Sequence, residues 1–449
     1  MKNKIFSGAI FLALSSIITK LLGAIYRIPL TNTLGLEGLG IYQMVFPVYC
    51  LMLDFSGQGL PFALSKIISS NLTEKEDKLK MLRVAIKTFI KIGGLLTLVL
   101  MLVSYPLSTL QGNKNAYLSY IFLAPAILFV SIISCFRGYF QGNLNMLPTA
   151  SSQVIEQVIK IVFGLLLTSL FLPSITLSAG GATLAVSISE LIALLFLIKV
   201  FPKEEKNKLF KLKIDKFEER NINKQIFRLI IPITLSGCLL PFSQIVDSFI
   251  IVNLLNKNGF LGTSLYGLLS GSATTIINLP VSVCYAVSVV CVPLISRAKD
   301  RQSKTKNTNT ALLVTLVISF CGMIFCRIFA QNIVDVLFKS FSLSQKQTAI
   351  NLIKIMSFAI VFLSLVQTQN SILIANGKTF APLFSMGIGI FLKFILEIVL
   401  VQNKRFNILG GGIAVITCYF VTCLINLLII TIIKARNENK TPCIKQCTT

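Results

Sequence analysis

The sequence contains no histidine and no tryptophan, and acidic residues are few: 17 Asp and Glu stand against 42 Lys and Arg in 449 residues. Without histidine there is no imidazole metal site, no Ser-His-Asp or Cys-His catalysis and no histidine proton relay. No other catalytic constellation is recognisable, so we do not expect an enzyme.

Charged residues of both signs are scarce, and apolar residues take their place. Only 13% of the residues are charged, whereas soluble domains average about 25%. Apolar residues make up 54%, and the mean hydropathy is +0.80. They occur in long blocks, and a helix needs about 20 such residues to cross a bilayer. The sequence therefore predicts an all-α integral membrane protein. Its apolar start is too long and too charged for a cleaved signal peptide, so we expect it to be a retained helix.

Twelve apolar spans are expected. They cover residues 6–30, 39–66, 84–108, 117–140, 150–171, 180–200, 226–254, 265–296, 311–338, 349–375, 382–402 and 409–433.

The basic residues of the loops predict the orientation. With the N-terminus inside, the outside loops hold only six of the 42: Lys114, Lys257, Lys339, Lys346, Lys404 and Arg405. Cytoplasmic loops of membrane proteins collect Lys and Arg. This asymmetry predicts a bacterial cytoplasmic membrane protein with both termini in the cytoplasm. It also accounts for most of the net charge of +25 without nucleic acid as a partner.

An internal repeat predicts two six-helix bundles. The segment "FQGNLNMLP" precedes Lys160 and "GGATLAV", and "IANGKTFAP" precedes Lys393 and "GGGIAV". Because each half holds six spans, the halves share orientation and are expected to be related by a pseudo-two-fold axis along the membrane normal. The expected parts are a bundle at 1–200, a basic cytoplasmic linker at 201–224, a second bundle at 225–434 and a cytoplasmic tail at 435–449.

Some charges fall inside the spans, where each is costly unless it faces a cavity or a partner. Lys20 and Arg27 lie two helical turns apart and so share one face. We favour a shared anion-binding face. The alternative is that both pair with buried acids such as Asp54 and Asp247, which are also candidates for coupling to a cation or a proton.

The fifth span carries a polar stripe. Gln153, Glu156, Gln157 and Lys160 recur at spacings of three and four residues, which places them along one helix face. Lys393 and Glu397 occupy the repeat-equivalent position. Each charged pair is either self-neutralising on its own helix or faces a polar cavity, and the sequence leaves both open.

These segments also resemble a known family. "FRGYFQGNLNMLPTASSQVIEQVIKI", "TKLLGAIYRIPL", "LGLEGLGIYQMVFPVY" and "GLPFALSKIIS" are similar to the stage V sporulation protein B family. That family is the polysaccharide-transport branch of the multidrug/oligosaccharidyl-lipid/polysaccharide exporter superfamily. The match covers nearly the whole chain and is more specific in the first half.

The resemblance implies a flippase for undecaprenyl-pyrophosphate-linked sugars such as the peptidoglycan precursor lipid II, with a link to the spore cortex. It implies that Lys20 and Arg27 hold the pyrophosphate, and Lys160 and Lys393 are expected in the same basic cavity. Alternating access would swing the two halves about this site. No cofactor is expected beyond a coupling cation, sodium or a proton, bound through an acid such as Asp54 or Asp247. Membrane lipids and cell-wall synthesis enzymes are the expected partners.

One departure from the family keeps alternatives open. Most members have fourteen helices, and in the lipid II flippases the extra pair helps to form a groove for the lipid tail. Twelve spans instead match the cation-coupled multidrug exporters of the same superfamily, whose cavities are expected to be acidic and aromatic. A non-transporting scaffold for cell-wall synthesis, in which the cavity charges are dispensable, is the third hypothesis.

Overall fold

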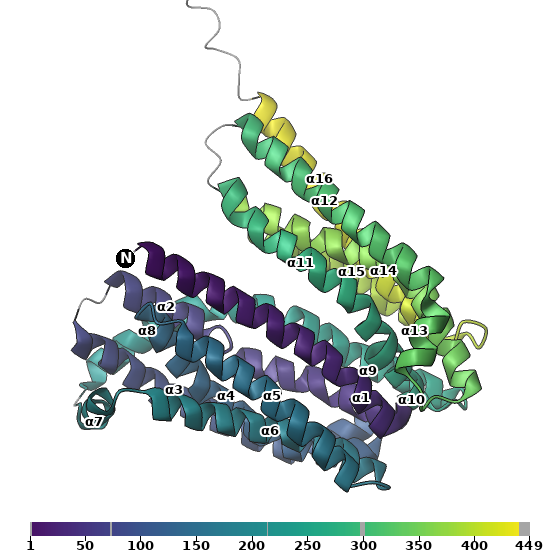
Figure 1. Ribbon diagram of the computed structural model, residues 1–449, viewed down its shortest axis with the longest axis horizontal. Helices are drawn as coiled ribbons and strands as arrows, with labels where there is room; N and C mark the ends of the chain where they lie inside the picture. Colours follow the sequence, from purple (N-terminus) through teal and green to yellow (C-terminus); the bar gives the residue numbers. More distant parts are fainter. Residues whose placement is uncertain (1, 72–73, 213, 297–300, 440–449) are drawn as a thin grey trace, which may run out of the picture. The chain divides into compact units, whose positions relative to one another are not determined.

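The computed structural model describes residues 2–71, 74–212, 214–296 and 301–439 (Figure 1). These residues form helices and short connections, with no strand among them. In chain order the helices are α1 (Lys2–Ser56), α2 (Leu60–Asn71), α3 (Lys75–Leu110), η1 (Lys114–Ala116), α4 (Tyr117–Gly142), α5 (Leu147–Leu170), α6 (Ile175–Val200), α7 (Lys203–Lys211), α8 (Lys216–Gly237), α9 (Leu239–Lys257), α10 (Gly262–Tyr266), the π-helical η2 (Gly267–Ala273), α11 (Thr274–Ser296), α12 (Arg301–Ile328), α13 (Ala330–Leu337), α14 (Leu343–Ala375), α15 (Ala381–Gln402) and α16 (Ile408–Asn439).

Eleven helical segments of the described chain are long and apolar enough to cross a membrane. The first, Leu21–Ser69, has 49 residues, which at 1.5 Å per residue is about 70 Å, more than twice a bilayer core of about 30 Å. It contains the end of the first expected span, 6–30, and the whole of the second, 39–66. Gly35, whose φ of 64° and ψ of −175° are not helical, marks a kink of α1 between them. The expected number of about twelve crossings thus agrees with eleven segments, of which one is double.

Several helices extend beyond the apolar spans. The seventh span was expected to begin at residue 226, but α8 begins at Lys216, inside the expected linker. The Asp215 side chain accepts a hydrogen bond from the Lys216 N–H at 2.8 Å, and Glu218 and Glu219 lie in the first turn. Acidic groups stabilise a helix N-terminus, so this charged segment is helical, as is α7 before it.

The chain divides into two compact units. The first comprises residues 1–252 and 263–267, and the second comprises residues 253–262 and 268–449. This division falls within α9 and not in the segment 201–224, so α8 and most of α9 belong to the first unit. The domain boundaries expected from the sequence stay a prediction.

In the first unit, α4 packs against α2, α3 and α6, and α5 packs against α1 and α6. Glycines permit the close approach of α1 and α5. A Cβ on Gly23 would stand 2.9 Å from Gln157 Nε2, and one on Gly164 would collide with the Tyr26 hydroxyl. Small residues at such crossings are the usual basis of helix packing in membranes. Tyr26 and Gln157 are both buried, and this crossing fixes one face of α5 against α1.

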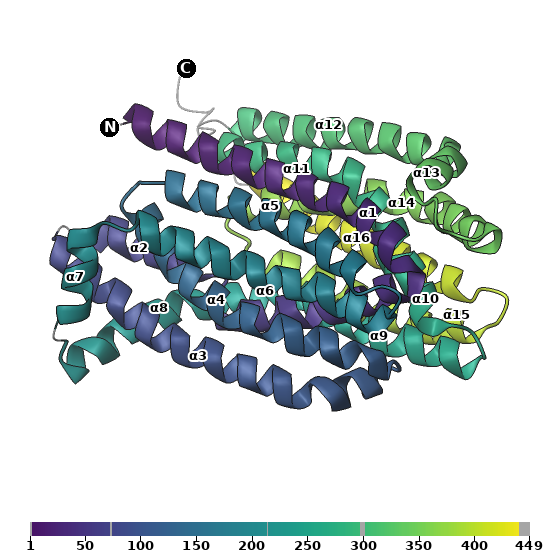
Figure 2. The same cartoon turned by 60° about the horizontal axis from the view of Figure 1, so that its bottom comes forward.

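In the second unit, α14 packs against α11, α12 and α16, and α15 packs against α16 (Figure 2). The α15–α16 pair repeats local features of the α5–α6 pair. Both α5 and α15 have proline in the first turn. A Cβ on Gly181 of α6 would stand 3.0 Å from the Leu167 carbonyl oxygen, and one on Gly410 of α16 would stand 2.7 Å from Leu400 Cβ. In each unit a glycine therefore lets the second helix turn back closely against the end of the first.

Candidate functional site

The polar stripe of α5 lies inside the first unit. Gln157 is buried, and Gln153, Glu156 and Lys160 are partly buried. The Gln153 side-chain oxygen accepts a hydrogen bond from Ser15 on α1 at 3.4 Å. The predicted stripe therefore does face protein at these positions.

Glu156 forms its ion pair with another helix. The Arg137 Nη2 atom on α4 lies 3.0 Å from Glu156 Oε2, and Arg137 Nε donates to the Ser152 hydroxyl at 3.0 Å. Both side chains of the pair are less than one fifth exposed. In the described structure, Glu156 and Lys160 do not form an ion pair, because no carboxylate oxygen of Glu156 lies within 4.0 Å of the Lys160 ammonium. The pair within α5 that the sequence left open is thus replaced by a pair between helices.

Lys160 and Arg27 share an electrostatic environment. Both exert their positive charges on Tyr42 of α1 and, together with the negative charge of Asp54, on Cys50 of the same helix. Lys160 also acts on Glu190 of α6, together with Arg137 and Glu156. Two of the four expected cationic site residues therefore lie in one polar cluster of the first unit, which we define as Arg27, Arg137, Glu156, Lys160 and Glu190.

Two members of this cluster were not among the predicted site residues. They are Arg137 and Glu190. Glu190 is 5% exposed, and its Oε2 atom has no hydrogen-bond partner in the described structure. The short connection at 143–146 was the available signal for Arg137, because it brings the end of α4 and the start of α5 together.

The other predicted residues of the first unit are Lys20, Asp54 and Asp247, of which Asp54 acts on Cys50 together with Lys160 and Arg27. Lys20 is on α1, but its side chain lies outside the described residues. Asp54, near the end of α1, packs against α8, where a Cβ on Gly237 would stand 2.8 Å from Asp54 Oδ1. Asp247 is buried in α9. Cation coupling through either acid stays a prediction.

Lys393 and Glu397 lie on α15 in the second unit. They are 5% and 0% exposed, and the Lys393 ammonium lies 5.4 Å from the centre of the Phe394 ring. Their burial agrees with a position inside a helical bundle, while a role in substrate binding stays a prediction.

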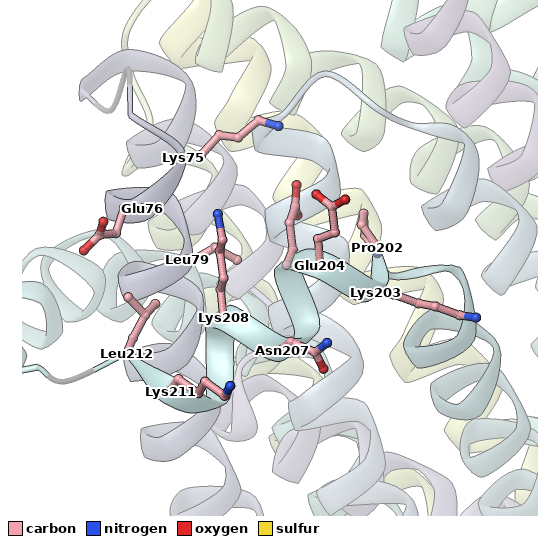
Figure 3. A pocket seen from close by; sticks show the side chains of 11 residues that line it. Lys75, Glu76, Leu79, Pro202, Lys203, Glu204, Asn207, Lys208, Lys211 and Leu212 are labelled. Carbon is pink, nitrogen blue, oxygen red and sulfur yellow. The ribbon is translucent and has the colours of Figure 1, made fainter.

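A hollow of about 820 Å³ borders α7, in the segment expected to be the basic linker. Figure 3 shows Lys75, Lys208 and Lys211 around it, with Glu76 and Glu204 among them. None of the predicted site residues lines it. Because acids stand between the lysines, the hollow lacks the uniform positive charge that would select an anion.

Comparison with known proteins decides the family. Residues 5–299 match the family described as "Polysaccharide biosynthesis protein". The chain belongs to this family.

Named relatives agree with this membership. Stage V sporulation protein B of Bacillus subtilis is 27% identical over 429 residues, which cover 93% of this chain and 81% of the relative. Lipid II flippase MurJ of Bacillus subtilis is 25% identical over 437 residues, covering 90% and 78%. An inward-facing multidrug resistance transporter of the MATE family has the same fold, with a TM-score of 0.80 at 15% identity and coverage of 97% and 100%.

The membership of this polysaccharide family fixes the general class. The chain is a multi-pass membrane protein of the transporter and flippase superfamily, as the resemblance implied, and the relatives named by an activity are a lipid II flippase and a multidrug transporter. The orientation of the termini stays a prediction.

Proposed function

We propose that the chain is a flippase for a polyprenyl-pyrophosphate-linked oligosaccharide, and that Arg27 and Lys160, two members of the polar cluster of the first unit, bind the pyrophosphate. The observation that carries this proposal is the shared environment of Arg27 and Lys160 around Tyr42 and Cys50. Two cations near the same side chains inside an apolar bundle favour an anionic ligand, because like charges repel strongly where water is scarce.

The distribution of acids supports an anion over a cation at this cluster. Glu156 is engaged by Arg137 at 3.0 Å, so one carboxylate is neutralised by a cation outside the proposed ligand set. Of the cluster as defined, three members are cations (Arg27, Arg137 and Lys160) and two are acids (Glu156 and Glu190), and both Arg137 and Lys160 act on Glu190. A phosphate group meets guanidinium and ammonium groups through charge-assisted hydrogen bonds, which are about twice as strong as neutral ones.

Among lipid-linked sugars we propose the peptidoglycan precursor lipid II as the substrate. This choice is supported by the relative named lipid II flippase MurJ, and a use in making the spore cortex by the relative named stage V sporulation protein B. A sodium ion or a proton, taken up by Asp54 or Asp247, is the proposed driving ion.

The test is translocation of lipid II in cells depleted of their own flippase, with the wild-type chain, Arg27→Ala, Lys160→Ala and Lys91→Ala. Lys91 is an exposed residue of α3 and serves as the control for loss of one positive charge from a span. We expect rescue by the wild type and Lys91→Ala, and loss of at least about tenfold for the other two, as for a charge-assisted contact worth about 1.5–3 kcal/mol.

A second candidate is a multidrug exporter, favoured by the TM-score of 0.80 to the MATE transporter. It predicts that wild-type chain, expressed and folded, fails to move lipid II but lowers the accumulation of organic cations in the same cells. It also predicts that Arg27→Ala and Lys160→Ala leave this efflux intact. That pair of results would reject the flippase proposal.

A further inference from the structure

A second recess of the first unit lies outside the polar cluster, on the flank of the bundle. It has a volume of about 410 Å³ and is lined by α3, α4, α6 and α7, a size within the range of small-molecule sites. Phe136, Leu194 and Phe201 form its buried floor, and the partly buried Ile86 and Ile132 line it as well. We call this recess the flank groove.

The flank groove reaches the surface of the first unit. Ile90 of α3 lines it and is 41% exposed. The residues that follow on α3 continue the exposed apolar surface, with Leu95 and Leu98 each about 60% exposed. From Arg83 to Ile90 the groove follows α3 for about 10 Å, at 1.5 Å per residue. One leaflet of the hydrocarbon core is about 15 Å deep, so the groove has the length of part of an acyl chain.

Two cations of the groove lie close to each other. Arg83 lines it from α3 and Lys206 from α7, one turn before Leu209, whose carbonyl accepts a hydrogen bond from Arg83. Arg83 donates to the carbonyl oxygens of Leu209 and Leu212, which hold the guanidinium at the end of α7 without cancelling its charge. Lys206 is exposed, and within the described chain it has no ion-pair partner.

The remaining cation of the groove is compensated. Lys87 lies one helical turn beyond Arg83, and its ammonium lies 2.7 Å from Glu219 Oε2. The carboxylate of Glu205, next to Lys206 in sequence, accepts a hydrogen bond from the Tyr139 hydroxyl at 2.9 Å. The groove therefore has a positively charged part, formed by Arg83 and Lys206, which we call its positive mouth. The rest of the groove, which we call its apolar course, is lined by apolar side chains.

We propose that the flank groove binds one anionic phospholipid of the surrounding membrane, with its phosphate at Lys206 and Arg83 and one acyl chain along Ile86, Ile90 and Ile132. Charge complementarity selects this occupant. A basic pocket between helices at the expected cytoplasmic end meets the leaflet that carries anionic headgroups. An uncharged lipid fills the apolar course equally well but leaves both cations without a counter-ion.

The absence of tryptophan from the chain permits a direct test. A single tryptophan introduced by Ile90→Trp reports on lipid at the groove. The matched control is Leu195→Trp, a 56% exposed position of α6 that does not line the groove. Arg83 and Phe201 both line the groove. Leu195 lies six residues before Phe201, and Ile90 lies seven residues after Arg83, so we expect the two tryptophans at comparable depths in the bilayer. Each variant is reconstituted in phosphatidylcholine bilayers with a minor fraction of brominated phosphatidylglycerol.

We expect bromine quenching at Ile90→Trp to exceed the proportion of phosphatidylglycerol in the bilayer, and quenching at Leu195→Trp to match it. Adding Lys206→Ala to Ile90→Trp should lower the enrichment about fivefold, as for one lysine at an anionic membrane surface. Lys203→Ala, an exposed lysine of α7 that does not line the groove, should leave the enrichment unchanged.

Three results would overturn the proposal. Equal quenching by brominated phosphatidylglycerol in the Ile90→Trp and Leu195→Trp variants means that the groove does not enrich this lipid. Equal quenching by brominated phosphatidylcholine, or enrichment that survives Lys206→Ala, means that the positive mouth does not recognise charge. Displacement of the brominated lipid by low concentrations of undecaprenyl phosphate would assign the groove to the tail of the transported lipid. None of these outcomes depends on whether the chain transports lipid II.

Discussion

The Arg137 guanidinium of α4 lies 3.0 Å from the Glu156 carboxylate of α5, and it joins two helices that follow each other through a four-residue connection. It keeps a carboxylate that is less than one fifth exposed in a fixed position beside Lys160 and Glu190. The pair orders the proposed ligand site without being part of it.

Loss of either partner of this pair should destabilise the first unit. We expect Arg137→Ala to lower the free energy of unfolding by about 3 kcal/mol, because it leaves a poorly solvated carboxylate without its cation. Arg137→Ala combined with Glu156→Gln should cost less than the sum of the two single changes. Thermal unfolding in detergent measures this cycle. Lys346→Ala breaks a more exposed pair with Asp335 and should cost less than about 1 kcal/mol; additive costs for the Arg137 cycle would contradict the prediction.

The crossing of α1 and α5 gives a second prediction. Gly164→Ala should destabilise the chain by about 2 kcal/mol, since the new Cβ collides with the Tyr26 hydroxyl. Tyr26→Phe should restore part of this loss, because it removes the nearest atom, the hydroxyl, which makes no hydrogen bond in the described structure, while the ring carbon Cζ stays 2.8 Å from the new Cβ. Gly94→Ala is the control: a Cβ there has nothing within 4 Å, and alanine should stabilise this helix interior by up to about 1 kcal/mol.

The end of α7 depends on Arg83. We expect Arg83→Ala to speed amide hydrogen exchange at Leu212, whose N–H donates to the Lys208 carbonyl at 3.0 Å, by about tenfold, because carbonyl groups at the helix end lose a charged donor. Lys87→Ala should leave α7 unchanged, since Lys87 pairs with Glu219 of α8. Exchange read by mass spectrometry separates the two. Equal protection of Leu212 in wild type and Arg83→Ala would show that α7 is held by its apolar contacts alone.

In the second unit, the Thr368 hydroxyl joins three helices. It lies 3.0 Å from Ser288 Oγ of α11 and 2.9 Å from Thr315 Oγ1 of α12. Thr368→Val keeps the shape of the side chain and removes both contacts, so we expect a loss of about 1–2 kcal/mol. Thr417→Val removes only a bond to the Ile413 carbonyl of its own helix and should change stability by less than about 0.5 kcal/mol. Similar unfolding temperatures for the two variants would contradict the prediction.

Hydropathy predicted the helical class and nearly all the spans, because burying a polar backbone in lipid leaves few alternatives to a helix. It could not predict α7 or the start of α8, since these helices are charged and are stabilised by local groups such as Asp215. The kink of α1 at Gly35 lies between the first two expected spans.

The sequence predicted which polar residues share a face of one helix, but it did not predict contacts between residues of different helices. The periodicity of α5 correctly grouped Gln153, Glu156 and Lys160, since spacing on one helix fixes a common face. The partner of Glu156 depended on how α4 rotates about its axis, and no periodic pattern in one sequence specifies that rotation. Arg137 was therefore not predicted to be part of the cluster.

Gly35 combines a φ of 64° and a ψ of −175° with open space where a Cβ would stand. The choice of residue at position 35 is therefore restricted by the left-handed backbone conformation and not by the space for a side chain. The mirror image of its backbone angles lies in the extended region that every L-residue adopts. A D-alanine introduced by chemical ligation should fit there without strain and reduce the freedom of the unfolded chain, whereas L-alanine should force the junction between the first two spans out of its shape.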